Sequence, residues 1–142
     1  MKKIIALTAG IVCASGVLAQ MNPEGLWRSI DDKSGQPKAE IRITANAGVL
    51  SGVVEKALLP SSEPLCVQCT DDRKDKPKLG MEIIRGAKKA EGKDVWEDGK
   101  ILDPDNGKNY TLALTPLEDG KKLQVRGYIG PFYRTQIWLR VQ

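Results

Sequence analysis

The stretch "AEIRITANAGVLSGVVEK" (Ala39–Lys56) predicts a β-hairpin and decides the fold class of the chain. Ile41 and Ile43 alternate with polar residues, which is the period of a strand with one buried face. Residues 46–48 supply a turn that includes Gly48, and the chain returns through Val53 as a second strand. The stretch therefore predicts two antiparallel strands joined by a short turn.

Short strands and turns continue on both sides of this hairpin. The sequence has no long run of apolar residues at helical spacing, and turn residues recur about every ten residues, which is typical of an all-β domain. The connection from Leu59 to Leu79 is long and irregular, and such loops are commonly functional or disordered. We expect further strands around Trp27, in "MEIIRGAK", as two short strands in "DVWEDGKILD" around Asp98-Gly99, after the Asn106-Gly107 turn, and in "LEDGKKLQVRGYIG" and "RTQIWLRVQ".

A sheet of this size avoids exposed edges by closing into a barrel. Eight strands leave an interior that side chains or one small ligand can fill. An outer-membrane barrel would need strands of about ten residues with an apolar outer band, and segments such as "EIRIT" and "GKKLQVRG" are too short and too charged. We therefore predict an all-β fold, a single antiparallel up-and-down β-barrel of about eight strands.

The two ends of the chain indicate how such a barrel closes. "EGLWRS" places Gly25 and Trp27 in the first strand, and "TQIWLRVQ" places Arg140 in the last. This pattern resembles the closing signature of lipocalin-type barrels, in which the guanidinium covers the indole at the closed end. A stacked pair of this kind contributes ~1 kcal/mol or more when it is shielded from water.

Several ordered motifs extend the resemblance along the chain. "GLWRS", "CVQC" followed by "KPKLGMEIIRG", "WEDGKILDPDNGKNY", "LQVRGYIG" and "RTQIWLR" together resemble the exported bacterial family called domain of unknown function 2147. The resemblance implies a lipocalin-like barrel in an envelope or secreted protein. It implies no particular biochemical activity.

The first 19 residues have the pattern of a cleaved export signal. Two lysines precede an apolar run from Ile4 to Leu18, and Ala19 suits the position before the cut. The run is shorter than the roughly 20 residues of a membrane-spanning helix, which disfavours a retained anchor. We predict a signal peptide over residues 1–19, one domain over residues 20–142, and a periplasmic or secreted location.

Charge and composition exclude some classes of partner. The full chain has a formal net charge of +4, and loss of the two lysines of the signal peptide leaves +2. The Lys-rich stretches "RKDKPK" and "AKKAEGK" are interrupted by acidic residues, whereas a nucleic-acid-binding protein needs a basic stripe with interleaved aromatic residues. We expect no nucleic acid and no membrane-spanning segment.

Cys66 and Cys69 could form a disulfide, a redox centre or half of a metal site. An oxidising compartment favours a structural disulfide, because the third cysteine leaves with the signal peptide. A redox centre would need a helix after Cys66, whereas "TDDRKDKPKLG" has no helical period and Asp71 and Asp72 oppose a thiolate. Zinc needs four ligands, and the chain has no histidine, so we predict no metal site.

The missing histidine also limits catalysis. It removes Ser-His-Asp triads, Cys-His pairs and the commonest general base. Carboxylate pairs of the glycosidase type stay possible, but most of the acids lie in motifs such as "EDG" and "DPDNG", where they stabilise turns. The sequence therefore disfavours an enzyme without excluding one, and it predicts no cofactor.

The last two strands carry the candidate ligand-binding residues, which are Arg126, Tyr128, Arg134, Gln136 and Trp138. If the strand face with arginine and tryptophan points inward, the barrel has a polar and aromatic pocket for an anionic or amphipathic molecule. If the alternating aliphatic face points inward, the same residues form a solvated outer surface. Trp96 and Tyr110 are more typical of core packing.

The sequence favours an exported carrier for a small amphipathic or apolar ligand. An alternative is an envelope module that binds protein partners or has a structural role, with a barrel filled by its own side chains and a Cys66–Cys69 loop that contacts a partner. A thiol-disulfide protein is a further alternative. These hypotheses differ in whether a ligand is retained.

Overall fold

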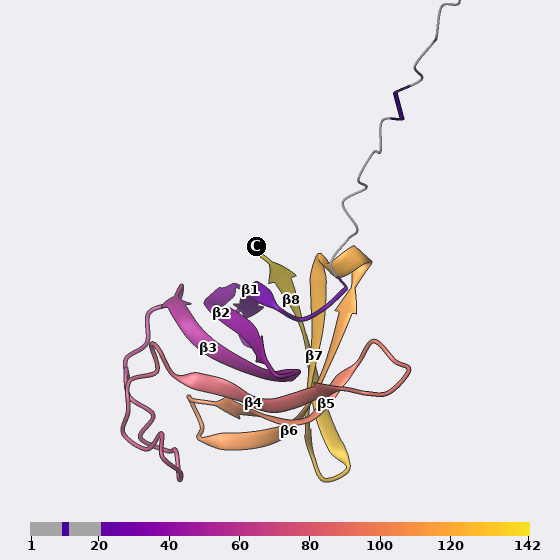
Figure 1. Ribbon diagram of the computed structural model, residues 1–142. Coiled ribbons are helices and arrows are strands. Elements are labelled where there is room, and N and C mark those ends of the chain that lie inside the picture. The colour runs from indigo at the N-terminus through magenta and orange to yellow at the C-terminus, as the bar shows by residue number, and fades with distance from the viewer. Residues whose placement is uncertain (1–9, 12–20) are drawn as a thin grey trace, which may run out of the picture.

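The computed structural model describes residues 10–11 and 21–142 (Figure 1). The predicted signal peptide therefore lies outside the described residues, apart from residues 10 and 11. Among the residues described, none belongs to a helix long and apolar enough to cross a membrane.

Across residues 21–142, eight antiparallel strands close into a barrel in the order of the sequence. This arrangement confirms the predicted fold class. The strands are β1 (Gly25–Ile30), β2 (Pro37–Asn46), β3 (Val49–Ala57), β4 (Glu82–Lys89), β5 (Trp96–Asp103), β6 (Lys108–Leu117), β7 (Lys122–Ile129) and β8 (Phe132–Arg140), and the short 3-10 turn η1 (Glu118–Gly120) precedes β7.

Strand β5 corrects one prediction. The segment around Asp98-Gly99 is one continuous strand with a β-bulge, where the sequence pattern had predicted two short strands separated by a turn. Asp98 has a φ of 64°, which aspartate tolerates better than most residues. A residue pair typical of turns is therefore accommodated inside a strand.

The alternation along β8 settles which face points inward. Trp138 is 3% exposed, whereas its neighbours Ile137 and Leu139 are 37% and 42% exposed. The face with arginine and tryptophan therefore points inward and the aliphatic face outward. On β7 the buried residues are Leu123 and Val125, and the alternating residues Lys122, Gln124 and Arg126 point outward.

Large side chains fill much of the barrel interior. The fully buried ones are Trp27, Ile41, Ile43, Leu50, Ile84, Leu112, Leu114 and Leu123. They come from β1, β2, β3, β4, β6 and β7, and Leu102 of β5 and Trp138 of β8 belong to the same buried cluster, so the core is continuous around the barrel.

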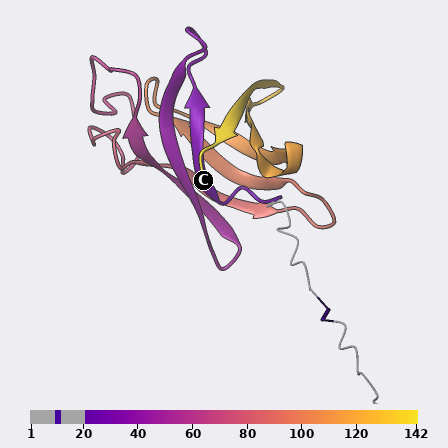
Figure 2. The same ribbon diagram turned by 90° about the horizontal axis from the view of Figure 1, so that it is seen from above.

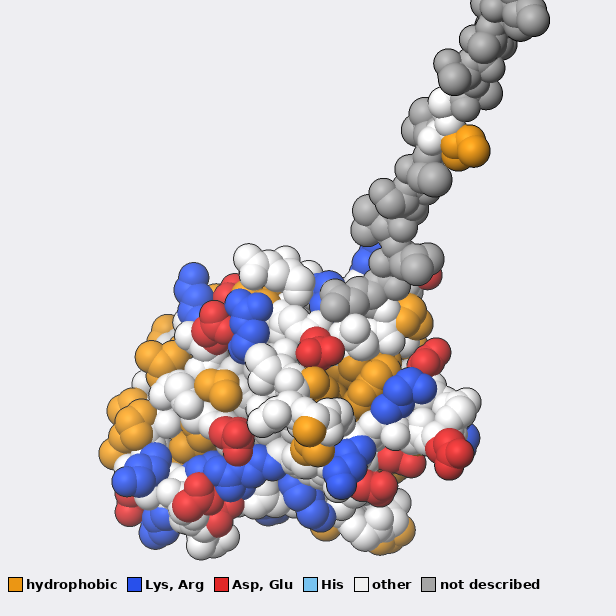
Figure 3. Space-filling model, viewed as in Figure 1, with side chains coloured by type: hydrophobic (Ala, Val, Ile, Leu, Met, Phe, Trp, Pro, Cys, Tyr) orange, Lys and Arg blue, Asp and Glu red, His pale blue; other side chains and the backbone are white. Residues whose placement is uncertain are grey.

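The barrel has two different ends. At one end lie residues 21–24, the C-terminal residues, the β2–β3 turn, the loop 90–95 and η1, and Figures 1 and 2 both place the C-terminus beside the start of β1. We call this the closed end. At the opposite end, the open end, lie the connections 31–36, 58–81, 104–107 and 130–131. Charged residues of both signs are interspersed over the visible face of the molecule (Figure 3).

The junction of β1 and β8 is the shortest pairing in the barrel. Within the described chain, these strands pair at Trp27–Arg140 and Arg28–Leu139 only. Towards the open end they separate, and a groove of about 350 Å³ lies between them. We call this region the β1–β8 seam.

Candidate functional site at the open end of the barrel

At the closed end, Arg140 lies over the indole of Trp27. The guanidinium carbon is 4.2 Å from the ring centroid. The guanidinium donates hydrogen bonds to the backbone carbonyls of Asn22, Glu24 and Gly120. Among the described residues no Asp or Glu side chain pairs with Arg140, and burial lowers the pKa of its guanidinium.

Gly25 completes this closure. Its φ is +132°, and an added Cβ would lie 2.5 Å from both an Arg140 guanidinium nitrogen and the Gln142 carbonyl oxygen. The closed end therefore requires a residue without a side chain at this position. It leaves no room for a ligand between β1 and the C-terminal residues.

At the open end, three predicted site residues of β8 share the inward face: a hydrogen bond joins Trp138 to Gln136, and Asp32 links Gln136 to Arg134. The Trp138 Nε1 donates to Gln136 Oε1 at 2.8 Å. The Gln136 Nε2 then donates to Asp32 Oδ1 at 2.7 Å. Arg134 Nη2 lies 3.0 Å from Asp32 Oδ2, so two donors from β8 converge on one carboxylate.

Tyr110 extends this cluster from β6. The Arg134 guanidinium carbon lies 5.5 Å from its ring centroid, and Asp103 lies 3.9 Å from Arg134 Nη2. An added Cβ at Gly127 would lie 3.0 Å from the Tyr110 side chain, so Gly127 leaves space for the ring. Tyr110, predicted as core packing, is only half-buried and lies at the open end.

The other two predicted ligand-binding residues lie on the outer face. The Arg126 guanidinium carbon is 4.7 Å from the Tyr133 ring centroid, and its Nε donates to Thr135 Oγ1 at 2.9 Å. The rings of Tyr128 and Tyr133 are 5.6 Å apart. This corrects the prediction that Arg126 and Arg134 line one pocket.

The register of the β7–β8 hairpin explains that separation. The two-residue turn pairs Ile129 with Phe132, which places Val125 opposite Gln136 and Arg126 opposite Thr135. Residues that pair across two strands share a face. The two-residue turn "GP" at residues 130–131 was therefore the sequence signal that could have shown that Arg126 and Arg134 lie on opposite faces.

Asp32 and Asp103 were not predicted as site residues. Asp32 lies in the stretch "DDKSG", which resembles any polar turn, and it contacts Gln136 over a separation of 104 residues. Only closure of the barrel brings these positions together. The groove beside them is lined by Ile30, Asp31, Asp32, Gly35, Thr135, Gln136 and Ile137.

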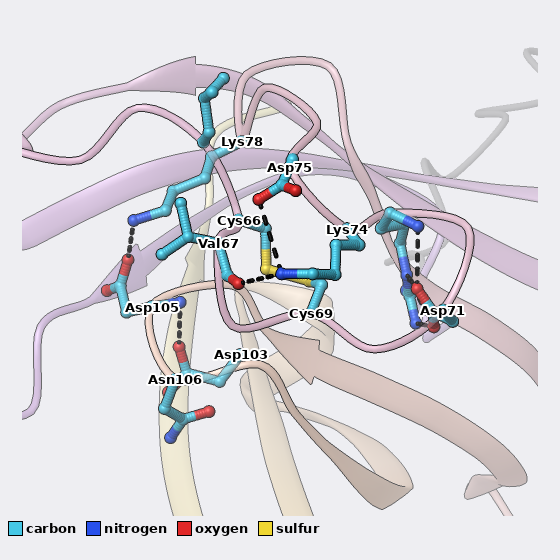
Figure 4. Close-up of a disulfide and its surroundings, with 12 residues drawn as sticks. Cys66, Val67, Cys69, Asp71, Lys74, Asp75, Lys78, Asp103, Asp105 and Asn106 are labelled. Carbon is cyan, nitrogen blue, oxygen red and sulfur yellow. Dashed lines mark hydrogen bonds and ion pairs between the residues drawn. A yellow bond between two sulfur atoms is a disulfide. The ribbon is translucent and has the colours of Figure 1, made fainter.

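The second part of the open end is the loop that contains the cysteines. Cys66 and Cys69 form a disulfide, and both side chains are buried. Figure 4 shows Lys74 reaching the Val67 carbonyl and Lys78 reaching Asp105 beside the disulfide. Thiol-disulfide exchange requires access to a sulfur, so this burial disfavours a redox role.

Arg73 anchors the loop to the barrel. Its buried guanidinium pairs with Asp71, and it also donates to the Glu82 carbonyl at 2.8 Å and to Asn109 Oδ1 at 3.2 Å. Hydrogen bonds from Arg73 hold the pKa of Asp71 well below its usual range. The Arg73 side chain therefore joins the loop to both β4 and β6.

Asp72, the second acid of this loop, pairs with Arg85 of β4. Two guanidinium nitrogens of Arg85 lie 2.9 Å from its carboxylate oxygens. Within the described residues, no three His, Cys, Asp or Glu side chains form a group that could hold a metal ion. Asp71 and Asp72 thus both have arginine partners.

Comparisons with known proteins agree with this architecture. A family model described as "Uncharacterized protein conserved in bacteria (DUF2147)" matches residues 25–140. The structure is similar to that of protein HP1028 from Helicobacter pylori, described as belonging to the lipocalin family, with a TM-score of 0.73 and 12% sequence identity. The match covers 87% of this chain and 85% of that chain. A search of curated proteins gave no match.

Proposed function

The chain belongs to the DUF2147 family, and from that premise we propose that it binds a small amphipathic molecule at the open end of the β1–β8 seam. The observation that carries this proposal is that Asp32 and Gln136, which line the groove, contact Arg134 and Trp138 respectively. Ligand sites combine apolar walls with a few placed polar groups, and the mouths of β-barrels are common locations for them.

The groove supplies both kinds of surface. Ile30 and Ile137, on the outer side of the seam, form its apolar walls, and Asp31, Asp32 and Gln136 supply polar groups. Its volume of about 350 Å³ lies at the lower end of the range for small-molecule sites. We infer that the ligand is small and lies in the seam, because large side chains occupy much of the barrel interior.

The setting of this activity is the cell envelope or the exterior. The export pattern of residues 1–19 and the disulfide both support a carrier that works in an oxidising compartment. The protein would hold its ligand there as a carrier.

Native mass spectrometry tests the carrier function directly. Protein purified from its own export compartment, without detergent or refolding, should carry extra mass that disappears on denaturation. Ile137→Glu should abolish that mass, because the new charge would enter the groove. Leu139→Glu is the matched control, since Leu139 is a similarly exposed aliphatic residue of the same strand outside the groove lining.

A second function is favoured by the filled interior. The fully buried core and the rigidly held cysteine loop also suit a module that binds a protein partner. A bare mass for the folded wild-type protein, together with capture of a partner that depends on the loop 64–80, would support this module and contradict the carrier.

A further inference from the structure

We propose that the ligand of the seam carries a carboxylate, and that this carboxylate replaces Asp32 on Arg134 and Gln136. The inference rests on the proposed binding function and specifies its ligand class. Asp32 then acts as an internal occupant of the site, which the ligand displaces.

The two donors are arranged to receive a carboxylate. The indole N–H of Trp138 can only donate, so it fixes the orientation of the Gln136 amide and presents Nε2 outward as a donor. One Asp32 oxygen accepts the hydrogen bond from Gln136, and the other forms an ion pair with Arg134 Nη2 at 3.0 Å. Charge-assisted contacts of this geometry select carboxylates over neutral oxygens.

A ligand can displace the Asp32 side chain from Arg134 and Gln136 without disturbing the turn that carries it. Its side chain is 48% exposed and that of Arg134 is 55% exposed, and exposed ion pairs contribute little stability. Asp32 belongs to the turn 31–36, whose own bonds join Asp31 to Gln36, Gly35 and Ser34. Rotation of the Asp32 side chain therefore breaks none of the bonds that close the turn.

The seam provides space for the rest of the ligand. Because β1 and β8 stop pairing at Arg28–Leu139, a ligand between Ile30 and Ile137 breaks no pairing between these two strands. The groove volume suits a short apolar chain or a single ring. The apolar part would contact the isoleucines while the carboxylate reaches β8.

The surrounding charges explain why Asp32 must move. Asp103 lies 3.9 Å from Arg134, so Arg134 already faces two carboxylates. A third carboxylate would be repelled while Asp32 stays in place. Binding and release of Asp32 are therefore coupled, and a variant without Asp32 should bind the same ligand more tightly.

Isothermal titration of the full mature protein with decanoate, decanol and decyltrimethylammonium tests the inference. Wild type should bind decanoate more tightly than decanol. Asp32→Ala should tighten decanoate binding about tenfold more than it changes decanol binding, because it removes a charge that competes only with the carboxylate. Arg134→Met should remove the preference for decanoate, whereas Arg126→Met, the matched arginine on the outer face, should retain it.

Each contrary result has a distinct meaning. Equal affinity for decanoate and decanol in wild type and in Asp32→Ala would overturn the carboxylate inference and leave the binding function standing. Tighter binding of decyltrimethylammonium than of decanoate would overturn it in favour of a cation that takes the place of Arg134. If none of the three probes binds to folded wild type, the proposed function fails as well.

Discussion

The two ends of the barrel each place an arginine over an aromatic ring, and they differ in where the guanidinium donates. At the closed end Arg140 covers Trp27 and donates to backbone carbonyls. At the open end Arg134 covers Tyr110 and pairs with the carboxylates of Asp32 and Asp103.

This difference separates a structural closure from an exchangeable site. A backbone carbonyl moves only when its strand or turn moves, whereas a side-chain carboxylate rotates away at little cost. The same pair of residue types therefore locks one end of the barrel and leaves the other available for a ligand. The predictions below test this contrast, beginning with the largest effect.

Arg140→Met should reduce the free energy of unfolding by about 3 kcal/mol, because it leaves several partly buried carbonyls without their charged donor. Arg134→Met should change it by less than about 0.5 kcal/mol, because its ion pairs are exposed. Urea unfolding at neutral pH measures both values. Equal losses for the two variants would remove the distinction between the ends.

The double variant Cys66→Ser/Cys69→Ser should lose at most about 2 kcal/mol, because the disulfide closes a very small loop. Arg73, Arg85 and Lys78 hold the same loop independently. The barrel should therefore remain folded, which thermal unfolding and circular dichroism would show. Global unfolding of this variant would mean that the open end depends on the disulfide as the closed end depends on Arg140.

The smallest predicted effect is the loss of the stability contributed by Asp71 at low pH. The pKa of Asp71 is lowered by hydrogen bonds from Arg73 and is lower in the folded than in the unfolded state. Its contribution to stability is therefore present above the unfolded pKa of about 4 and is lost as the pH falls below it. Asp71→Asn should be less stable than wild type at pH 7, and this difference should shrink at pH 3. Amide hydrogen exchange of the loop 64–80 measures this stability difference between Asp71→Asn and wild type. A difference of the same size at pH 7 and pH 3 would contradict a stabilising role for the charge of Asp71.

Local patterns predicted the strands because alternation and turn residues depend on neighbours in the sequence. The hairpin through Ile41 and Val53 follows its pattern closely. The error at Asp98 arose because a bulge keeps a strand continuous through residues that are typical of turns.

The candidate site was predictable only in part. Arg134, Gln136 and Trp138 share a face because they alternate along one strand. Arg126 and Tyr128 were assigned to the same pocket wrongly, since the relation between two strands depends on register as well as on alternation. Tyr110 and Asp32 belong to the cluster through contacts that no sequence period encodes.

The sequence by itself predicted the all-β barrel, its family and a disulfide between Cys66 and Cys69, because these follow from local alternation, ordered motifs and an even cysteine count in an exported chain. The tertiary structure decided which face of β8 points inward and which acid Arg134 meets. The physical reason is barrel closure, which joins β1 to β8 at one end and brings Asp32 across the seam to residues more than a hundred positions away.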